Sequence, residues 1–418
     1  MRAETAAQDK TARMVARWRE LAAAIAARTG EDAPIIPGEL SVLGSGIAHN
    51  DIMVSDETAL LHADVVFHCL YDRVTESWIN QLRPDAYDLR ILYNPSVARH
   101  LSYVCMAEAL LHFVRQGKKV VAMFYGHPGF FATPTHRAIK VARAEGHRTT
   151  MRPGISALDH LVADLGFDPM IPGLISFEAS ELVYGGRVLD PSLHTILWQI
   201  GAVGDYGFAP GGFENKGFER LLDLLIAAFG EDWTAVHYIA PHYVGLDPVI
   251  EAMPLAALRD PAAKQSISAI STLYLAPMVG ARDGAIRQRT QQYALPEWAA
   301  PITERSAPPR HAAAFYGQVE RAAMALFEAF VPPDHYRATP PTAANRFLQA
   351  LSRDVALLER FSAAPGKVLA DPRFAALSPR ARRLLQVPHP RAINAALNDE
   401  TAMVDGPDLE ATAPIVAG

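Results

Sequence analysis

Residues 119–169 read KVVAMFYGHPGFFATPTHRAIKVARAEGHRTTMRPGISALDHLVADLGFDP and decide the fold class. Lys119–Tyr125 is a mostly apolar run typical of a buried strand, and Arg148–Met151 is a second, shorter candidate strand. Each is followed by helical spacing of apolar residues, over Thr133–Glu145 and over Ser156–Leu165. Strands that alternate with helices of this length predict an α/β domain with a largely parallel sheet.

The same alternation continues on both sides of this stretch. Upstream, Leu40–Leu43 and Asp64–Leu70 are candidate strands and Ser102–Gln116 is a candidate helix. Downstream, the candidate elements are the strands Thr195–Ile200, Thr234–Ile239 and Ser268–Ala276 and the helix Gly217–Phe229. We therefore expect one catalytic unit over residues 36–280, built from two α/β lobes with a ligand cleft between them.

The segments that flank this unit differ from it in composition. Residues 1–35 contain a helical pattern over 8–28 and then a linker with two prolines, and residues 281–341 form a connector that ends in the candidate helix His311–Phe330. Residues 342–398 are predicted to be all helical, with a first helix over Thr342–Phe361 and two short ones opened by Ser378-Pro379 and His389-Pro390. Residues 399–418 hold five acidic and no basic residues, which predicts a flexible tail.

Bulk composition excludes several classes of protein. The net charge of -6 gives no electrostatic footprint for nucleic acid. No apolar segment reaches the length of about 18 residues that a membrane helix needs, so no membrane partner is expected and the chain is interpreted as cytoplasmic. The two cysteines, Cys69 and Cys105, lie in apolar surroundings and are expected to be free thiols. The histidines lack metal-ligand spacing, and no metal is predicted.

Glycine-containing loops follow three of the predicted strands. Gly126-His127-Pro128-Gly129 and Pro153-Gly154 come at successive strand ends, which is where ligands bind in open α/β sheets. Either loop alone is also explained by a structural turn, but two together favour a shared binding cleft. Gly44-Ser45-Gly46 lacks the third glycine of a dinucleotide fingerprint, so a tight strand–helix turn is the simpler interpretation there.

Tyr93, Arg99 and Tyr103 span a polar turn and the start of a helix. Arg99 and Tyr103 are four residues apart and share a helix face if the helix begins by residue 99. A guanidinium beside a phenol favours the phenolate and can lower its pKa. Without further context, a packed tyrosine and a surface arginine remain the plainer interpretation.

The order of these motifs resembles that of the tetrapyrrole methylases. Gly44-Ser45-Gly46-Ile47, the loop at 125–129, Pro153–Ala157, Trp198–Gly201 and Ser271–Tyr274 fall in the family's order. More narrowly, residues 124–169 resemble the borosin peptide α-N-methyltransferases, and this match extends over about residues 38–278. The position of His127 is usually Asp in ordinary tetrapyrrole methylases, so the chain departs from the wider family there.

The resemblance implies a two-lobed α/β catalytic domain of tetrapyrrole-methylase type with an all-α C-terminal region, and S-adenosylmethionine as the cofactor. It implies Arg99 and Tyr103 as the catalytic pair, with Tyr93 as a supporting tyrosine. The cofactor-binding residues that it implies, together with the two glycines of the first loop, are Tyr125, His127, Phe130, Ala157, Gln199, Ala240, Ser271, Thr272, Gly44 and Gly46. Together these residues imply N-methylation of peptide backbone amides.

The C-terminal region is expected to carry the peptide substrate. Some borosins have their substrate at their own C-terminus, and residues 342–398 resemble the small helical precursor domains of others, although an ordinary helical appendage remains an alternative. In the tail, Ile415, Val416 and Ala417 are the first candidates for methylation and residues 402–404 the second. Pro414 has no N–H to replace.

We expect a homodimer in which the tail of one chain enters the cleft of the other. Helix 311–330 would clasp the second subunit through Tyr316, Val319 and Phe327, and helix 8–28 would add dimer packing. Two other functions stay open from the sequence: a corrin or porphyrin C-methyltransferase, and a non-catalytic module that binds S-adenosylmethionine and recruits partners.

Overall fold

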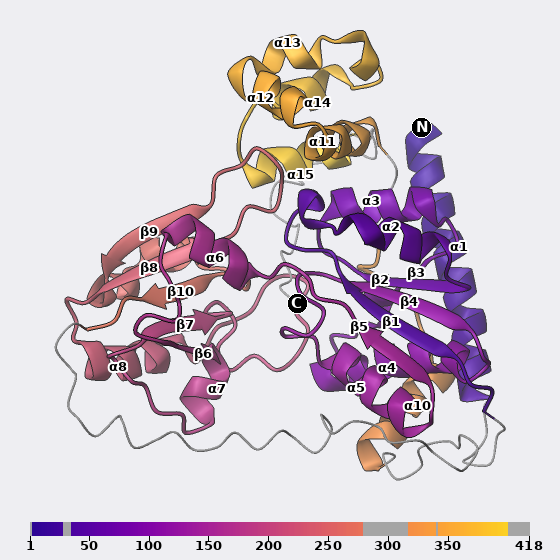
Figure 1. The fold of residues 1–418 in the computed structure, drawn as a ribbon, viewed down its shortest axis with the longest axis horizontal. Coiled ribbons are helices and arrows are strands. Elements are labelled where there is room, and N and C mark those ends of the chain that lie inside the picture. The colour runs from indigo at the N-terminus through magenta and orange to yellow at the C-terminus, as the bar shows by residue number, and fades with distance from the viewer. Residues whose placement is uncertain (1, 28–34, 279–316, 340–341, 400–418) are drawn as a thin grey trace.

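The computed structural model describes residues 2–27, 35–278, 317–339 and 342–399. Two five-stranded sheets form two lobes, and a cluster of C-terminal helices sits across one end of both (Figure 1). None of the helices in these ranges is both long and apolar enough to cross a membrane. The predicted α/β class and the all-helical C-terminal region are both confirmed.

The first lobe is a parallel sheet in the order β3-β2-β4-β1-β5. Its strands are β1 (Glu39–Gly44), β2 (Val65–Cys69), β3 (Tyr87–Asp88), β4 (Lys119–Phe124) and β5 (Arg148–Met151). In the sheet register, Gly44 of β1 and Cys69 of β2 both pair with Phe124 of β4. The carboxyl ends of these three strands are therefore level, and the loops that follow them meet at one edge of the sheet.

Helices on both faces of this sheet come from the crossover connections. They are α2 (Val54–Leu61), α3 (Arg73–Leu82), α4 (Arg99–Val114) and α5 (Thr133–Ala144). Most of α4 is buried, because it packs against the sheet, α5 and α10 (Gln318–Glu328). Its first turn is half-exposed, and this is where Arg99 and Tyr103 lie.

The second lobe is a mixed sheet in the order β6-β7-β10-β8-β9, in which only β6 and β7 pair in parallel. The strands are β6 (Leu174–Glu178), β7 (His194–Trp198), β8 (Thr234–Ile239), β9 (Val249–Pro254) and β10 (Thr272–Leu275). The accompanying helices are α6 (Ala157–Leu165), α7 (Ala179–Tyr184), α8 (Phe218–Phe229) and α9 (Pro261–Ser266). The predicted strands of this lobe and the helices α6 and α8 are found, but β6, β9, α7 and α9 were not predicted.

The N-terminal helix α1 (Arg2–Ala26) packs against the first lobe of its own chain. Its apolar stripe includes Trp18, which is fully buried beside the ring of Tyr87 at 5.6 Å. Phe327 of α10 is buried in the same core, whereas Val319 is 39 % exposed and Tyr316 lies outside the described residues. The apolar faces assigned above to dimer contacts are thus largely covered within one chain.

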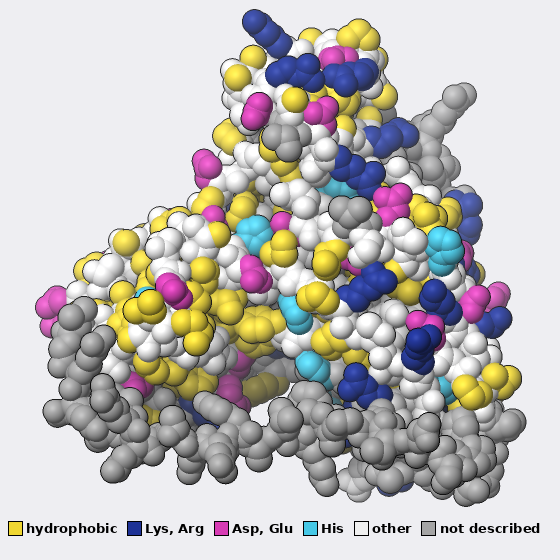
Figure 2. Space-filling view, in the orientation of Figure 1, with side chains coloured by type: hydrophobic (Ala, Val, Ile, Leu, Met, Phe, Trp, Pro, Cys, Tyr) yellow, Lys and Arg dark blue, Asp and Glu magenta, His cyan; other side chains and the backbone are white. Residues whose placement is uncertain are grey.

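The C-terminal region consists of α11 (Ala343–Arg353), α12 (Val355–Ala363), α13 (Pro365–Leu369), α14 (Pro379–Leu384) and α15 (Pro390–Asn398). The helix predicted over 342–361 is broken at Asp354, because its side chain accepts a hydrogen bond from the Leu357 amide at 2.9 Å and caps a new helix. Basic side chains gather over these helices at the top of the view (Figure 2). Residues 343–398 hold nine Lys and Arg and three Asp and Glu, so this region is basic although the whole chain is acidic.

Candidate functional site

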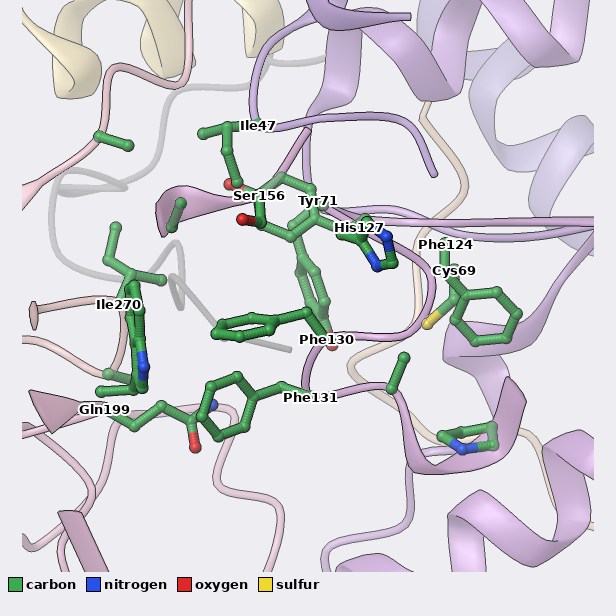
Figure 3. A pocket seen from close by; sticks show the side chains of 18 of the residues that line it. Ile47, Cys69, Tyr71, Phe124, His127, Phe130, Phe131, Ser156, Gln199 and Ile270 are labelled. Atoms are coloured by element: carbon green, nitrogen blue, oxygen red, sulfur yellow. The ribbon is translucent and has the colours of Figure 1, made fainter. Parts of the chain in front are cut away.

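A cleft lies where the two lobes meet, and its empty space, counted out to the open solvent, is about 990 Å³. Phe130 and Phe131 of the first lobe project into it and face Gln199 and Ile270 of the second (Figure 3). Nine residues predicted for the site line this cleft: Tyr93, Tyr103, Tyr125, His127, Phe130, Ala157, Gln199, Ala240 and Thr272. The structure therefore brings these nine residues together at one cleft.

The loop after β4 is shaped by Gly126 and His127. Gly126 has φ +70°, which favours glycine, and the Nδ1 atom of His127 accepts a hydrogen bond from the Gly129 amide at 2.9 Å. Thr135 at the start of α5 donates its hydroxyl to the Pro128 carbonyl at 2.5 Å. His127 therefore both lines the cleft and stabilises the turn that presents Phe130 to it.

Gly44 and Gly46 correct one part of the predicted site, because neither lines the cleft in the structure. A side chain on Gly44 would come within 2.3 Å of the Gly126 carbonyl, and the amide of Gly126 donates to the Gly46 carbonyl at 2.9 Å. These glycines let the loop after β1 pack directly on the loop after β4. They support the cleft wall from behind.

Two residues of the cleft hold unusual backbone conformations. Phe131 has φ +55° and Gln199 has φ +58°, and only one other non-glycine residue in the described ranges, Asn215, has a positive φ. Such conformations cost about 1–3 kcal/mol and concentrate at functional sites. This signal marks the cleft independently of any sequence motif.

Arg99 and Tyr103 lie on one face of the first turn of α4, as predicted. Arg99 does not itself line the cleft but interacts with the hydroxyl of Tyr103, which does. The Nη2 atom of Arg99 donates to the Asp205 carbonyl at 2.6 Å, and its amide donates to the Tyr206 carbonyl at 3.0 Å. The loop that follows β7 in the second lobe therefore fixes the arginine at the edge of the cleft.

Tyr93 supports Tyr103 from the opposite side. The two rings meet edge to face with centroids 6.2 Å apart, and Tyr93 stacks on Phe208 at 4.7 Å. Phe208 belongs to the same loop of the second lobe that holds Arg99. The three residues predicted to be catalytic thus form one contiguous group in the first lobe, and this group contacts the loop of the second lobe at Asp205 and Phe208.

The pKa of Tyr103 differs from the expectation drawn from sequence. Burial raises this pKa above its ordinary value, and the nearby Arg99 guanidinium only partly offsets that effect. Burial also raises the pKa of Tyr93 well above its usual range. In the free enzyme Tyr103 is therefore a neutral phenol at physiological pH, because desolvation outweighs the arginine.

Ser271 is the second correction to the predicted site. Its side chain is fully buried outside the cleft, where the hydroxyl lies 2.7 Å from His237 Nε2 and accepts from the Ser268 amide at 2.9 Å. His237 Nδ1 lies 2.8 Å from the Glu251 carboxylate, so the proton is placed on Nδ1 and Nε2 accepts from the serine. This Glu–His–Ser arrangement holds the turn that carries Ala269 and Thr272 into the cleft.

Replacement of Ser271 by Ala is expected to lower the free energy of unfolding by about 1–3 kcal/mol, because buried hydrogen-bonding groups of His237 and Ser268 lose their partner. Urea denaturation measures the change. The control is Ser352→Ala, which removes only a hydroxyl bonded to the preceding turn of its own helix. Equal unfolding free energies for the wild type and Ser271→Ala would show that the network does not stabilise the turn.

Several residues that line the cleft were not predicted from the sequence, among them Cys69, Tyr71 and His242. Cys69 is the last residue of β2, Tyr71 follows that strand, and His242 follows β8. His242 stacks on Tyr125 with centroids 6.0 Å apart, and burial lowers its pKa to about 4, so it is neutral. The signal that could have found Tyr71 is its place at the carboxyl end of a parallel strand beside β4.

The cleft fits a cofactor with a positively charged sulfur. The rings of Tyr71, Tyr125 and Phe130 line it, and aromatic faces attract cations. Thr272 and Gln199 supply polar groups on an otherwise apolar surface, as in other small-molecule sites. Among the described residues, no group of three or more His, Cys, Asp or Glu is arranged to hold a metal ion.

Comparison with known proteins gives the family. Residues 39–240 match the model of the tetrapyrrole (corrin/porphyrin) methylases. The chain is 39 % identical over 320 residues to a methyltransferase/ribosomally synthesized type I borosin cyclic peptide precursor from Coprinopsis marcescibilis, covering 76 % of this chain and 81 % of that protein. It is 35 % identical over 336 residues to the methyltransferase/cyclic peptide dendrothelin A precursor from Dendrothele bispora, covering 77 % and 78 %.

Among solved structures, uroporphyrin-III-C-methyltransferase from Thermus thermophilus matches with a TM-score of 0.41 and 16 % identity, covering 59 % of this chain and 95 % of that one. The assignment follows from the curated relatives, which share more than a third of their residues with this chain over most of its length. The chain therefore belongs to the borosin methyltransferase–precursor family within the tetrapyrrole methylases, and it is an S-adenosylmethionine-dependent methyltransferase.

Proposed function

We propose that the protein N-methylates backbone amides of a peptide, and that this peptide is its own C-terminal tail. The names of the relatives support the second part, because each joins a methyltransferase and a ribosomally synthesized peptide precursor in one chain. The observation that carries the first part is the Arg99–Tyr103 pair, which stands at the edge of a cleft suited to the cofactor.

The chemistry requires a group that removes a proton. An amide nitrogen is a poor nucleophile because its lone pair is delocalised into the carbonyl. S-adenosylmethionine, when bound, supplies an activated methyl group on a positively charged sulfur. A further cation that faces the phenol lowers the pKa of Tyr103, so that the phenol loses its proton to solvent, and the resulting phenolate then takes the N–H proton of the peptide at its oxygen.

Arg99 has a separate role in this proposal. Loss of the amide proton leaves negative charge on the peptide oxygen, and a guanidinium stabilises such an oxyanion. Two hydrogen bonds to the carbonyls of Asp205 and Tyr206 hold Arg99 in place before the peptide binds. The walls of the cleft, which include Tyr93, then align the amide nitrogen of the peptide with the methyl group of the cofactor.

The proposed acceptor positions lie in the tail, outside the described residues. Ile415, Val416 and Ala417 are the first candidates, since they form an apolar end that suits an apolar cleft. Intact-mass analysis of the purified chain, followed by fragmentation, tests the proposal. Increments of one methyl group located on backbone nitrogens within residues 401–418 support it, and a tail that stays unmodified with excess cofactor would contradict it.

We further propose that two copies exchange tails, so that methylation occurs between subunits of a homodimer. Co-expression of the wild type with a mass-tagged Tyr103→Phe chain tests this point. Exchange predicts methylated tails on the Tyr103→Phe chains, because a wild-type partner supplies the active cleft. Methylation confined to wild-type chains would place the reaction within one subunit instead.

The rate of methyl transfer is expected to rise with pH. The phenolate is the reactive form of Tyr103, and burial, only partly offset by Arg99, raises its pKa above the ordinary value. Because the positive charge of the bound cofactor lowers this pKa again, the phenolate fraction, and with it the rate, should increase about tenfold per pH unit from about pH 7 up to the pKa in the cofactor complex and then level off. Single-turnover assays at saturating cofactor measure this. A wild-type rate that stays constant or falls over this range would rule out Tyr103 as the base.

A further inference from the structure

Helix α15 contacts both lobes of the methyltransferase. Its Asn394 accepts a hydrogen bond from the hydroxyl of Tyr243 at 2.7 Å, and its Asn398 accepts from the guanidinium of Arg73. Tyr243 follows β8 in the second lobe, whereas Arg73 begins α3 in the first. Nine residues at the end of the described helical region therefore reach across the junction of the lobes, as Figure 1 shows.

The apolar core of the helical region also includes side chains from both lobes. Val74 of α3 and Tyr243 are buried together with Phe347 and Ile393, which belong to α11 and α15. Gln349 of α11 donates to the Val74 carbonyl at 3.2 Å. Burial of apolar surface and hydrogen bonds thus hold the helical region to each lobe, rather than leaving it as an independent appendage.

The lobe residues that α15 contacts adjoin the cofactor cleft. Tyr243 comes directly after His242, and Arg73 lies two positions after Tyr71. Asp72, between Tyr71 and Arg73, fixes the start of α3 by accepting from the amides of Val74 and Thr75. A shift of α15 would therefore be passed to the cleft wall through one or two residues of backbone.

Aromatic contacts connect these wall residues across the cleft. The ring of Tyr125 meets Tyr71 of its own lobe edge to face at 6.0 Å and stacks on His242 of the other lobe at 6.0 Å. His242 and Tyr71 thus hold Tyr125 from two sides, and each lies within two residues in sequence of a residue that α15 contacts. The relative position of the lobes sets this arrangement.

We propose that the helical region 343–398 positions the two walls of the cofactor cleft, with α15 as the tie between the lobes. Arg73, Tyr243 and Asn394 are positioning residues, since none of them lines the cleft. Docking of the helical region and binding of the cofactor are then coupled, and the coupling acts in both directions. The same helices that lead into the substrate tail prepare the site that acts on it.

Cofactor affinity in the full-length chain tests this proposal. Tyr243→Phe and Asn394→Ala each remove the same hydrogen bond, and each is expected to weaken S-adenosylhomocysteine binding about five-fold by calorimetry. The double variant should bind no more weakly than the weaker single variant, because both changes break one contact. The matched control is Asp371→Ala, which removes a cap and an ion pair inside the helical region.

Wild-type affinity in both single variants would overturn the proposal, as would equal weakening in Asp371→Ala. Hydrogen exchange on the wild type gives a second readout that needs no variant. Addition of S-adenosylhomocysteine is expected to slow exchange of the amides of α15, and unchanged exchange there would also overturn the proposal. Neither readout depends on methylation of the tail, so its result is independent of the proposed function.

Discussion

Replacement of Tyr103 by Phe is expected to lower the rate of methyl transfer by about 10²–10⁴-fold, the range for loss of a positioned general base. The phenyl ring keeps the edge-to-face contact with Tyr93, so the cleft wall retains its shape. Only the hydroxyl that faces Arg99 is lost. Binding of S-adenosylhomocysteine should therefore stay within about three-fold of the wild type, and the effect should fall on kcat.

The matched control is Tyr87→Phe, a half-buried tyrosine of the same lobe that does not line the cleft. Intact mass after timed incubation with cofactor measures the rate for all three proteins. If Tyr103→Phe methylates its tail at the wild-type rate while Tyr87→Phe does the same, the hydroxyl of Tyr103 takes no part in proton removal. If Tyr103→Phe loses cofactor binding instead, the residue supports the cleft rather than the chemistry.

Replacement of Arg99 by Met is expected to lower the rate by about 10²–10³-fold, because the developing charge on the peptide oxygen loses its partner. Two further effects act in the same direction. The pKa of Tyr103 rises once the guanidinium no longer offsets burial, and the loop at Asp205 loses a hydrogen bond. Arg99→Lys should recover only part of the activity, because an ammonium keeps the charge without the guanidinium geometry.

Two measurements separate these contributions of Arg99. A pH–rate profile of Arg99→Met that stays steep to higher pH than the wild type would report the change in the pKa of Tyr103. Arg187→Met, at an exposed ion pair of the second lobe, is the control for loss of a surface arginine. Activity of Arg99→Met equal to that of Arg187→Met would contradict a role for Arg99 in the reaction.

Sequence patterns located the site because the fold concentrates it at strand ends. Strands β4 and β5 begin and end within one residue of their predicted limits, since β4 is an apolar run that ends just before Tyr125-Gly126 and β5 lies between Gly146 and Pro153. The loops after such strands meet at one edge of a parallel sheet. That is why Tyr125 and His127, which follow β4, line the same cleft as Ala157, which follows β5 about 30 residues later.

The corrections concern properties that depend on packing. Ser271 lies between two cleft residues in sequence and Gly44 lies three residues before Ile47, but a buried histidine engages Ser271 and close contact of two loops keeps Gly44 out of the cleft. The spacing of Arg99 and Tyr103 predicted their contact correctly. It could not predict that burial would raise the pKa of Tyr103, because desolvation depends on how the folded chain surrounds the phenol.

The docking of the helical region against the two lobes also could not be predicted from the sequence. The sequence of residues 343–398 predicts helices. The lobe residues that pack against these helices, Tyr243 and Val74, lie more than 90 residues away, and no local pattern marks them as contacts. A single Asp at position 354 was enough to divide a predicted helix in two. Contacts between distant segments decide the docking, whereas a local cap at Asp354 decides where the helix is divided.

The most direct test of the account is the position of the tail in a crystal structure with S-adenosylhomocysteine bound. The account predicts a backbone nitrogen of residues 401–418 about 3 Å from the Tyr103 hydroxyl, with the Arg99 guanidinium on the oxygen of the same peptide group. A tail bound in the cleft while Tyr103 and Arg99 both point away from its backbone would contradict it.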